Sequence, residues 1–171
     1  MTKLRPSGFT IVELLIVIVI IGILAAITVV AYNGIQDRAK NSKRDSDVTL
    51  YTKAIFAARV NDGKLLKDIT GSTWSAGSCA VSSGNTGNVE PKDLAKTHIC
   101  WTRYYDNLTR IGTAASMNLD GLRAGDARGN PYILDENDGE SCSQDLIATF
   151  TGNGTASYST FKYIPRVTAD C

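Results

Sequence analysis

The first third of the chain contains a long uncharged stretch followed by a regular amphipathic pattern. After Glu13 no charged residue occurs until Asp37, so the 23 residues from 14 to 36 are uncharged. A bilayer core roughly 30 Å thick needs about 20 helical residues to cross it. Residues 16–21 are all β-branched, but a lone strand cannot satisfy its backbone groups in lipid. The pattern therefore predicts a membrane-spanning helix.

The amphipathic part follows directly. Between Asp37 and Asn61 apolar residues recur at the three- and four-residue spacing of a helix with one buried face. They are Val48, Tyr51, Ile55 and Ala58, with Leu50, Ala54 and Ala57 on the adjoining face. Asn61-Asp62-Gly63 ends the pattern with a glycine, which adopts the left-handed conformation common at helix ends. We expect one helix over residues 9–61, roughly 80 Å long at about 1.5 Å per residue, whose second half packs against the rest of the chain.

Beyond Gly63 shorter elements alternate with turn residues. Residues 71–88 are rich in Ser, Gly, Thr and Asn and predict a loop. Pro91 favours the start of a short helix that runs through Lys96. The aromatic content of residues 99–105 favours a strand.

The last part of the chain predicts a small antiparallel sheet. Residues 132–134 follow the turn Gly129-Asn130-Pro131 and predict a short strand. Residues 146–151 and 155–164, joined by Gly152-Asn153-Gly154, predict a β-hairpin. A long helix followed by an antiparallel sheet is an α+β fold.

The positions of the charged residues predict how the first helix is oriented in the membrane. The net charge of the chain argues against binding of nucleic acid. The chain has 18 Lys+Arg and 17 Asp+Glu, a net charge of +1, whereas binding through overall attraction needs a strongly basic balance. Lys3 and Arg5 precede the apolar stretch without an acidic residue, so we expect the N-terminus to stay in the cytoplasm and the rest to be translocated. A basic cluster beyond the apolar stretch is interpreted as a solvated helix face rather than a DNA-binding patch. Its members are Arg38, Lys40, Lys43 and Arg44.

Glu13 is the single charge in residues 9–36. A carboxylate inside a membrane helix costs about 2.5–3.5 kcal/mol on insertion scales. The carboxylate of Glu13 either reaches the membrane interface by snorkelling, as in a simple single-pass signal anchor, or it pairs with a cation that the apolar stretch itself does not contain. Cleavage between Gly8 and Phe9 would supply that cation as an α-amine on Phe9, four positions away on a helix. A secretory signal peptide is disfavoured because its apolar core is only about 7–15 residues long.

The string Gly8-Phe9-Thr10-Ile11-Val12-Glu13, after a short basic leader and before a 20-residue apolar helix, closely resembles the type IV prepilin signature. The resemblance implies that a prepilin peptidase removes the leader after Gly8 and that the new N-terminus, Phe9, is methylated. Subunits of this kind wait in the cytoplasmic membrane until an assembly platform and motor extract them into a helical filament with their apolar helices in its core. There Glu13 would meet the Phe9 amine of its own chain or of a neighbour and fix the axial register.

The resemblance divides the chain into four parts. They are a basic leader at 1–8, a hydrophobic transmembrane and filament-core helix at 9–36, its amphipathic continuation at 37–62 and a globular α+β head with disulfides at 63–171. It implies identical or related pilin subunits, the prepilin peptidase and the assembly machinery as partners, and an extracellular pilus as the final location. A type II secretion pseudopilin or a minor pilin is the alternative. Many pilins have a proline near the end of the apolar segment, whereas this chain has Val30, which favours a continuous helix.

All four cysteines lie in the part expected to be translocated: Cys79, Cys100, Cys142 and Cys171. An even number in an oxidising compartment favours disulfides and allows three connectivities. We favour the pairing of sequence neighbours, and the second such pair resembles the C-terminal disulfide loop of many pilins. The favoured pairs are Cys79–Cys100 and Cys142–Cys171. A zinc site is disfavoured because the spacings contain no CxxC pair and His98 is the only histidine.

A run of carboxylates after Leu134 raises the question of calcium. An EF-hand register fails because its first ligand position falls on this leucine. Asp126 with the following Gly129-Asn130-Pro131-Tyr132 weakly resembles a stretch that precedes the calcium-binding loop of type II secretion pseudopilins. No cofactor is expected, and calcium at Asp126, Asp135 and Asp138 stays open beside a solvated acidic turn.

An enzyme hypothesis requires a nucleophile with a base, or a metal set. His98 lies near Cys100 and could form a thiolate–imidazole pair in a membrane-anchored extracellular hydrolase. No GxSxG, HExxH or glycine-rich phosphate loop occurs in the chain, so we expect no enzyme. Two triplets, Asn107-Leu108-Thr109 and Asn153-Gly154-Thr155, match the glycosylation sequon, which often occurs by chance.

Overall fold

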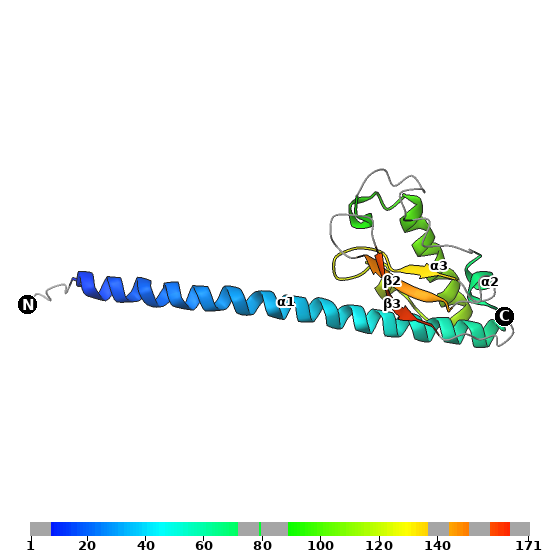
Figure 1. Cartoon of the computed structure of the whole chain (residues 1–171), viewed down its shortest axis with the longest axis horizontal. Coiled ribbons are helices and arrows are strands. Elements are labelled where there is room, and N and C mark those ends of the chain that lie inside the picture. The colour runs from blue at the N-terminus through cyan, green and yellow to red at the C-terminus, as the bar shows by residue number, and fades with distance from the viewer. Residues whose placement is uncertain (1–7, 72–78, 80–88, 137–143, 151–157, 165–171) are drawn as a thin grey trace, which may run out of the picture. The chain divides into compact units, whose positions relative to one another are not determined.

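A computed structural model of the chain describes residues 8–71, 79, 89–136, 144–150 and 158–164. The chain forms two compact units, Met1–Ala39 and Lys40–Cys171. In chain order the described elements are α1 (Ile11–Asp62), α2 (Leu66–Thr70), η3 (Pro91–Asp93), α3 (Ile99–Ala115), η4 (Asp120–Leu122), β1 (Ile133–Asp135), β2 (Leu146–Phe150) and β3 (Tyr158–Tyr163), as Figure 1 shows.

Helix α1 confirms the single long helix predicted from the sequence. It contains 52 residues and ends at Asp62. Gly63 stops it with a φ of +65°, and the backbone N–H of Gly63 donates to the carbonyl of Arg59 at 2.8 Å. Glycine adopts this conformation freely whereas other residues do not, so the end of the helix follows from the sequence.

The second unit contains a three-stranded antiparallel sheet in the order β1-β2-β3. β1 pairs with β2 through Ile133 and Ala148, and β2 pairs with β3 through Ile147 and Lys162, with a register shift after Ile147. This sheet and the helices confirm the α+β fold, the short strand after the glycine turn and the two strands of the expected hairpin. The residues that join β2 to β3 lie outside the described part of the chain.

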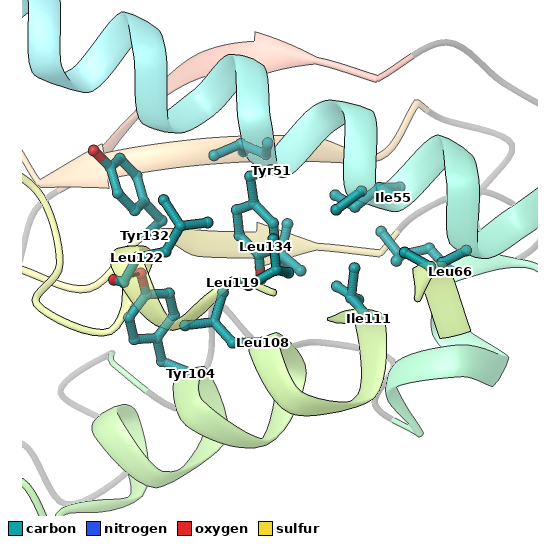
Figure 2. Packing of buried hydrophobic residues seen from close by; sticks show 14 of the residues in the cluster. Tyr51, Ile55, Leu66, Tyr104, Leu108, Ile111, Leu119, Leu122, Tyr132 and Leu134 are labelled. Carbon is teal, nitrogen blue, oxygen red and sulfur yellow. Dashed lines mark hydrogen bonds between the residues drawn. The ribbon is translucent and has the colours of Figure 1, made fainter. Parts of the chain in front are cut away.

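One hydrophobic core joins the second part of α1, helices α2 and α3, and the sheet. In Figure 2, Tyr51 and Ile55 of α1 point toward Leu108 and Ile111 of α3, and Leu134 of β1 belongs to the same cluster. All of these side chains are buried, and burial of each large apolar side chain contributes about 1.5–3 kcal/mol. The buried face of α1 is the one that the helical spacing predicted: Val48, Tyr51, Ala54, Ile55 and Ala58.

Residues 99–105 form the start of helix α3, so the strand predicted there is wrong. The buried face of α3 repeats every three or four residues: Trp101, Tyr104, Leu108 and Ile111. This is a helical period, and packing on the core overrides the weak preference of aromatic residues for strands.

His98 caps helix α3, because its Nδ1 accepts the backbone N–H of Cys100 at 3.2 Å. The short helix predicted after Pro91 is a 3₁₀ turn that ends at Asp93.

Candidate functional site

The first part of α1 presents an apolar surface along its length. The large apolar side chains described in this part are between 49% and 86% exposed. Among the described residues, α1 is the helix that is long and apolar enough to cross a membrane. An apolar surface of this extent marks a contact with a membrane or with other protein.

Thr10 and Glu13 fix the start of this helix. Thr10 directly precedes α1, and its hydroxyl accepts the backbone N–H of Glu13 at 3.3 Å. The carboxylate of Glu13 accepts the backbone N–H of Thr10 at 2.8 Å and the hydroxyl of Thr10 at 2.7 Å. This reciprocal arrangement is a capping box, which satisfies amide groups that the start of a helix leaves open. Glu13 is therefore held within its own chain.

The expected cleavage site lies directly before the capping box. Gly8 and Phe9 are exposed and precede the first helical residue. A Cβ placed on Gly8 would have no other atom within 4 Å, so the space on the side-chain position of Gly8 is open. Phe9 precedes Glu13 by four positions in the sequence, and it lies just before the helix that carries the carboxylate.

Sequence reasoning proposed Gly8, Phe9 and Glu13 as site residues and did not consider Thr10, which the structure places beside Glu13. The signal was present, because a threonine followed three residues later by a glutamate is the pattern of a capping box. The pattern was hidden by the neighbouring residues, which are apolar and make the segment resemble the interior of a membrane helix.

Two comparisons with known proteins decide the family. The family model of the prokaryotic N-terminal methylation motif matches residues 3–29. The chain is 32% identical over 123 residues to the type IV narrow pilus major component PilA5 of Thermus thermophilus, and the match covers 68% of this chain and 97% of that protein. The chain belongs to the type IV pilin and pseudopilin family.

Two further relatives of this pilin-family chain are type II secretion system core proteins G. The protein of Aeromonas hydrophila is 36% identical over 64 residues, which cover 37% of this chain and 45% of the relative. The protein of Pseudomonas aeruginosa is 35% identical over 96 residues, which cover 56% of this chain and 63% of the relative. The chain thus spans less than two thirds of either relative, and no solved structure matches it. Proteins of this family are structural subunits without a cofactor rather than enzymes.

In this chain of the pilin and pseudopilin family, Cys100 and His98 do not form the pair that the hydrolase hypothesis needs. Cys100 forms a disulfide with Cys79, and His98 caps helix α3. A disulfide sulfur is not a thiolate nucleophile. The bond joins one of the two pairs favoured from the sequence, whereas Cys142 and Cys171 lie outside the described residues.

Asp126, the first of the calcium candidates, accepts hydrogen bonds from its own loop. Its Oδ1 accepts the backbone N–H groups of Arg128 at 2.8 Å and Asn130 at 2.9 Å. Asp135 lies in β1, and Asp138 lies outside the described residues. In the part of the chain that the structure describes, no group of three His, Cys, Asp or Glu side chains is placed to hold a metal ion. The turn after Asp126 is explained by its backbone hydrogen bonds.

The basic cluster after the apolar stretch separates into two kinds of residue. Arg38 and Lys40 are exposed, in agreement with a solvated helix face. Lys43 is exposed as well, but its Nζ donates to Oδ2 of Asp47 at 2.5 Å and to the carbonyl of Gly125 at 3.1 Å. Lys43 thereby attaches α1 to the loop that leads into β1.

Tyr132 completes this attachment from the sheet side. Its hydroxyl donates to the same Oδ2 of Asp47 at 2.8 Å. Burial, followed by the hydrogen bond and the charge of Asp47, raises the pKa of Tyr132 well above its usual value. The hydroxyl therefore remains a donor at any physiological pH.

Asn107 is the asparagine of one of the two sequons. It lies on the buried face of α3 and is only 2% exposed. A buried asparagine inside a helix cannot accept a glycan, because glycosylation acceptors lie on the surface. The second sequon, at Asn153, lies outside the described residues.

Proposed function

We propose that this protein is a structural subunit of a type IV pilus-like filament. It is made as a prepilin with a leader at 1–8, cleaved after Gly8, N-methylated at Phe9 and polymerised through its apolar helix. The observation that carries the proposal is the exposed apolar surface of the first part of α1 with Glu13 at its start. Such a surface needs lipid before assembly and neighbouring subunits after it.

Cleavage changes the charge at the start of the helix. The uncleaved chain carries Lys3 and Arg5 before the apolar segment, and Glu13 is held by Thr10. Cleavage removes both cations and leaves an α-amine on Phe9. In a filament the amine of one subunit pairs with the carboxylate of Glu13 in a neighbour. Loss of one partner of a buried ion pair costs about 3–5 kcal/mol, so the pair disfavours wrong axial registers.

The path to the filament follows from the same segment. Residues 9–36 span the cytoplasmic membrane with the N-terminus on the cytoplasmic side, where the prepilin peptidase acts. The assembly platform and motor then move the subunit into an extracellular filament of identical or related pilins. Lipid and neighbouring helices are similarly apolar, so helix packing and the ion pair stabilise the filament core. Gly22, Ala25 and Ala26 allow the close helix approach that this packing needs.

A type II secretion pseudopilin is the second candidate. It is favoured by the 35% identity over 96 residues to core protein G of Pseudomonas aeruginosa. The match to PilA5 covers 97% of that protein, whereas the matches to the two core proteins G cover 45% and 63%. The greater coverage makes a pilus subunit the first proposal.

N-terminal mass spectrometry of filaments sheared from cells tests the proposed function. The expected dominant species begins at methylated Phe9, and a Gly8→Leu variant is expected to keep its leader and to stay in the membrane fraction. The leucine adds a branched side chain beside the bond that must enter the peptidase. A wild-type filament protein that begins at Met1 would contradict the proposal.

A further inference from the structure

Two hollows meet at the C-terminal end of α3, on the surface of the globular unit. The larger, of about 740 Å³, lies between the end of α1, α2 and α3, and the smaller, of about 380 Å³, lies between α3 and η4. Helices α2 and α3 lie side by side here in Figure 1. The wall that both hollows share consists of Thr109, Thr113 and Ser116, which are all exposed. Three hydroxyl groups therefore stand between the two hollows.

Ser116 ends α3 in a backbone conformation that glycine usually adopts. Its φ is +53°, and among the described residues it is the only residue other than glycine with a positive φ. The other described positions of this kind are all glycines: Gly63, Gly71, Gly125 and Gly129. The left-handed conformation is strained for a residue with a Cβ. Serine thus costs stability at a position where glycine would not, which points to a use of its side chain.

The hydroxyl of Ser116 is available to a ligand, because within the described part of the chain it forms no hydrogen bond. Its neighbours are held in place and keep spare groups. Nδ2 of Asn61 donates to the carbonyl of Ala114 at 2.9 Å, which leaves Oδ1 as an acceptor. Oδ1 of Asn118 accepts the backbone N–H of Asp120 at 2.7 Å, which leaves Nδ2 as a donor. The hollows therefore offer both donors and acceptors.

The ionised side chains that line the hollows are already paired with opposite charges. The pairs are Arg110–Asp106, Arg123–Asp120 and Asp62–Lys64. The hollows thus carry no net charge that would attract an ionic ligand. Their floor is apolar, because Leu108 and Leu119 line the smaller hollow and Ile69 lines the larger one, each at most 7% exposed.

We propose that the two hollows bind a neutral oligosaccharide, with one sugar unit in each hollow and the hydroxyl of Ser116 hydrogen-bonded to it. The hydroxyl groups of a sugar both donate and accept, and its C–H groups pack on an apolar floor. An extended peptide fits less well, because the walls are mainly helical and a helix offers no free backbone edge for pairing. The inference goes beyond the proposed function and concerns the globular unit alone.

Titration of the full-length protein with short oligosaccharides tests the inference. The protein is kept in a detergent without a sugar head group, and calorimetry measures the binding of maltotriose, cellotriose and chitotriose. At least one of these neutral trisaccharides is expected to bind with a Kd on the order of 1 mM, because only a few side chains offer hydrogen bonds. Trigalacturonic acid, which is charged, and a neutral tripeptide are expected to bind at least about tenfold more weakly.

Variants of Ser116 separate binding from stability. Ser116→Gly relieves the left-handed strain and removes the hydroxyl, so its Tm is expected to rise by about 2 °C while binding weakens about three- to tenfold. Ser116→Ala keeps the Cβ, so its Tm is expected to stay near that of wild type while binding weakens to the same extent. Thr102→Ala is the matched control, because Thr102 is exposed on the same helix but outside both hollows, and it is expected to bind as wild type does.

Several results would overturn the inference. One is that none of the three neutral trisaccharides binds to the wild-type protein at tens of millimolar. Others are unchanged binding in both Ser116 variants, an equal loss in Thr102→Ala, or a Tm that falls in Ser116→Gly. Equal or tighter binding of trigalacturonic acid or of the tripeptide would overturn the assignment of a neutral sugar. Since the titration uses the unassembled protein, none of these results bears on filament formation, and the proposed function depends on its own test.

Discussion

At the scale of single residues, the loop before β1 depends on backbone positions that accept only glycine. Gly125 has a φ of +81°, and a Cβ built on it would lie 2.3 Å from the carbonyl oxygen of Asn130. That oxygen also accepts the backbone N–H of Asp126 at 2.7 Å, and the carbonyl of Gly125 accepts the Nζ of Lys43. The conformation of this loop and its attachment to α1 therefore both depend on Gly125, a residue without a side chain.

Gly125→Ala is expected to destabilise the globular unit by about 1–3 kcal/mol, because the new methyl group must displace the Asn130 carbonyl and φ stays unfavourable. Urea denaturation of the purified protein measures the change. Gly121→Ala is the matched control, because a Cβ there has no atom within 4 Å and its effect is expected to stay near zero. Equal stability of the two variants would contradict this account of the loop.

At the scale of the elements, a buried ion pair attaches the last turn of α1 to the residue before β2. The side chains of Arg59 and Asp145 are 2% and 1% exposed, and the guanidinium donates to the carboxylate. The carbonyl of Asp145 also accepts the backbone N–H of Ile164 at 2.7 Å, just after β3. One aspartate therefore connects the helix to two strands.

Asp145→Ala is expected to destabilise the fold by about 3–5 kcal/mol, because it removes a buried carboxylate to which the buried guanidinium donates. Arg59→Met/Asp145→Leu removes both charges and is expected to recover most of that loss. The control is Asp106→Ala in the exposed pair with Arg110, whose side chains are 46% and 50% exposed, where a loss below about 1 kcal/mol is expected. Chemical denaturation gives all three values, and a double variant as unstable as Asp145→Ala would contradict the argument.

The elements that the sequence predicted well are those with a local signal. The helical spacing of Val48, Tyr51 and Ile55 gave the buried face of α1, and Gly63 gave its end. The expected processing residues are also local, since cleavage and membrane insertion act on a short segment before any tertiary fold exists.

Features that depend on distant contacts were not predicted. Arg59 and Asp145 are 86 residues apart, and no local sequence pattern predicts their contact. Helix α3 was missed for a different reason. Its aromatic residues were weighed by their preference for strands, whereas the spacing of Trp101, Tyr104 and Leu108 already carried the helical period. When a segment contributes one face to a core, the spacing of its apolar residues predicts its secondary structure better than the strand or helix preference of each residue does.

At the scale of the whole molecule, the two units obtain their stability from different sources. The unit Lys40–Cys171 buries its own apolar core. The large apolar side chains described in Met1–Ala39 stay at least 49% exposed, so their free energy depends on lipid or on other copies. Folding and assembly are therefore separable, and a substitution at the start of α1 can change one without the other.

Glu13→Gln makes this separation measurable. Glutamine at this position still closes a capping box with Thr10, so the start of α1, membrane insertion and cleavage after Gly8 are expected to stay as in wild type. The amide cannot pair with an α-amine as a carboxylate does. Filament yield is therefore expected to fall at least about tenfold, the equivalent of about 1.4 kcal/mol per contact.

Two measurements on the same cells decide the outcome for Glu13→Gln. Mass spectrometry of the membrane fraction should show the chain starting at Phe9 in wild-type amount, while the sheared fraction is depleted. A glutamine variant that polymerises as well as wild type would show that the helix start needs the hydrogen bonds of residue 13 but not its charge. In that case the exposed apolar surface alone would drive assembly, and the axial register would have to come from contacts in the globular unit.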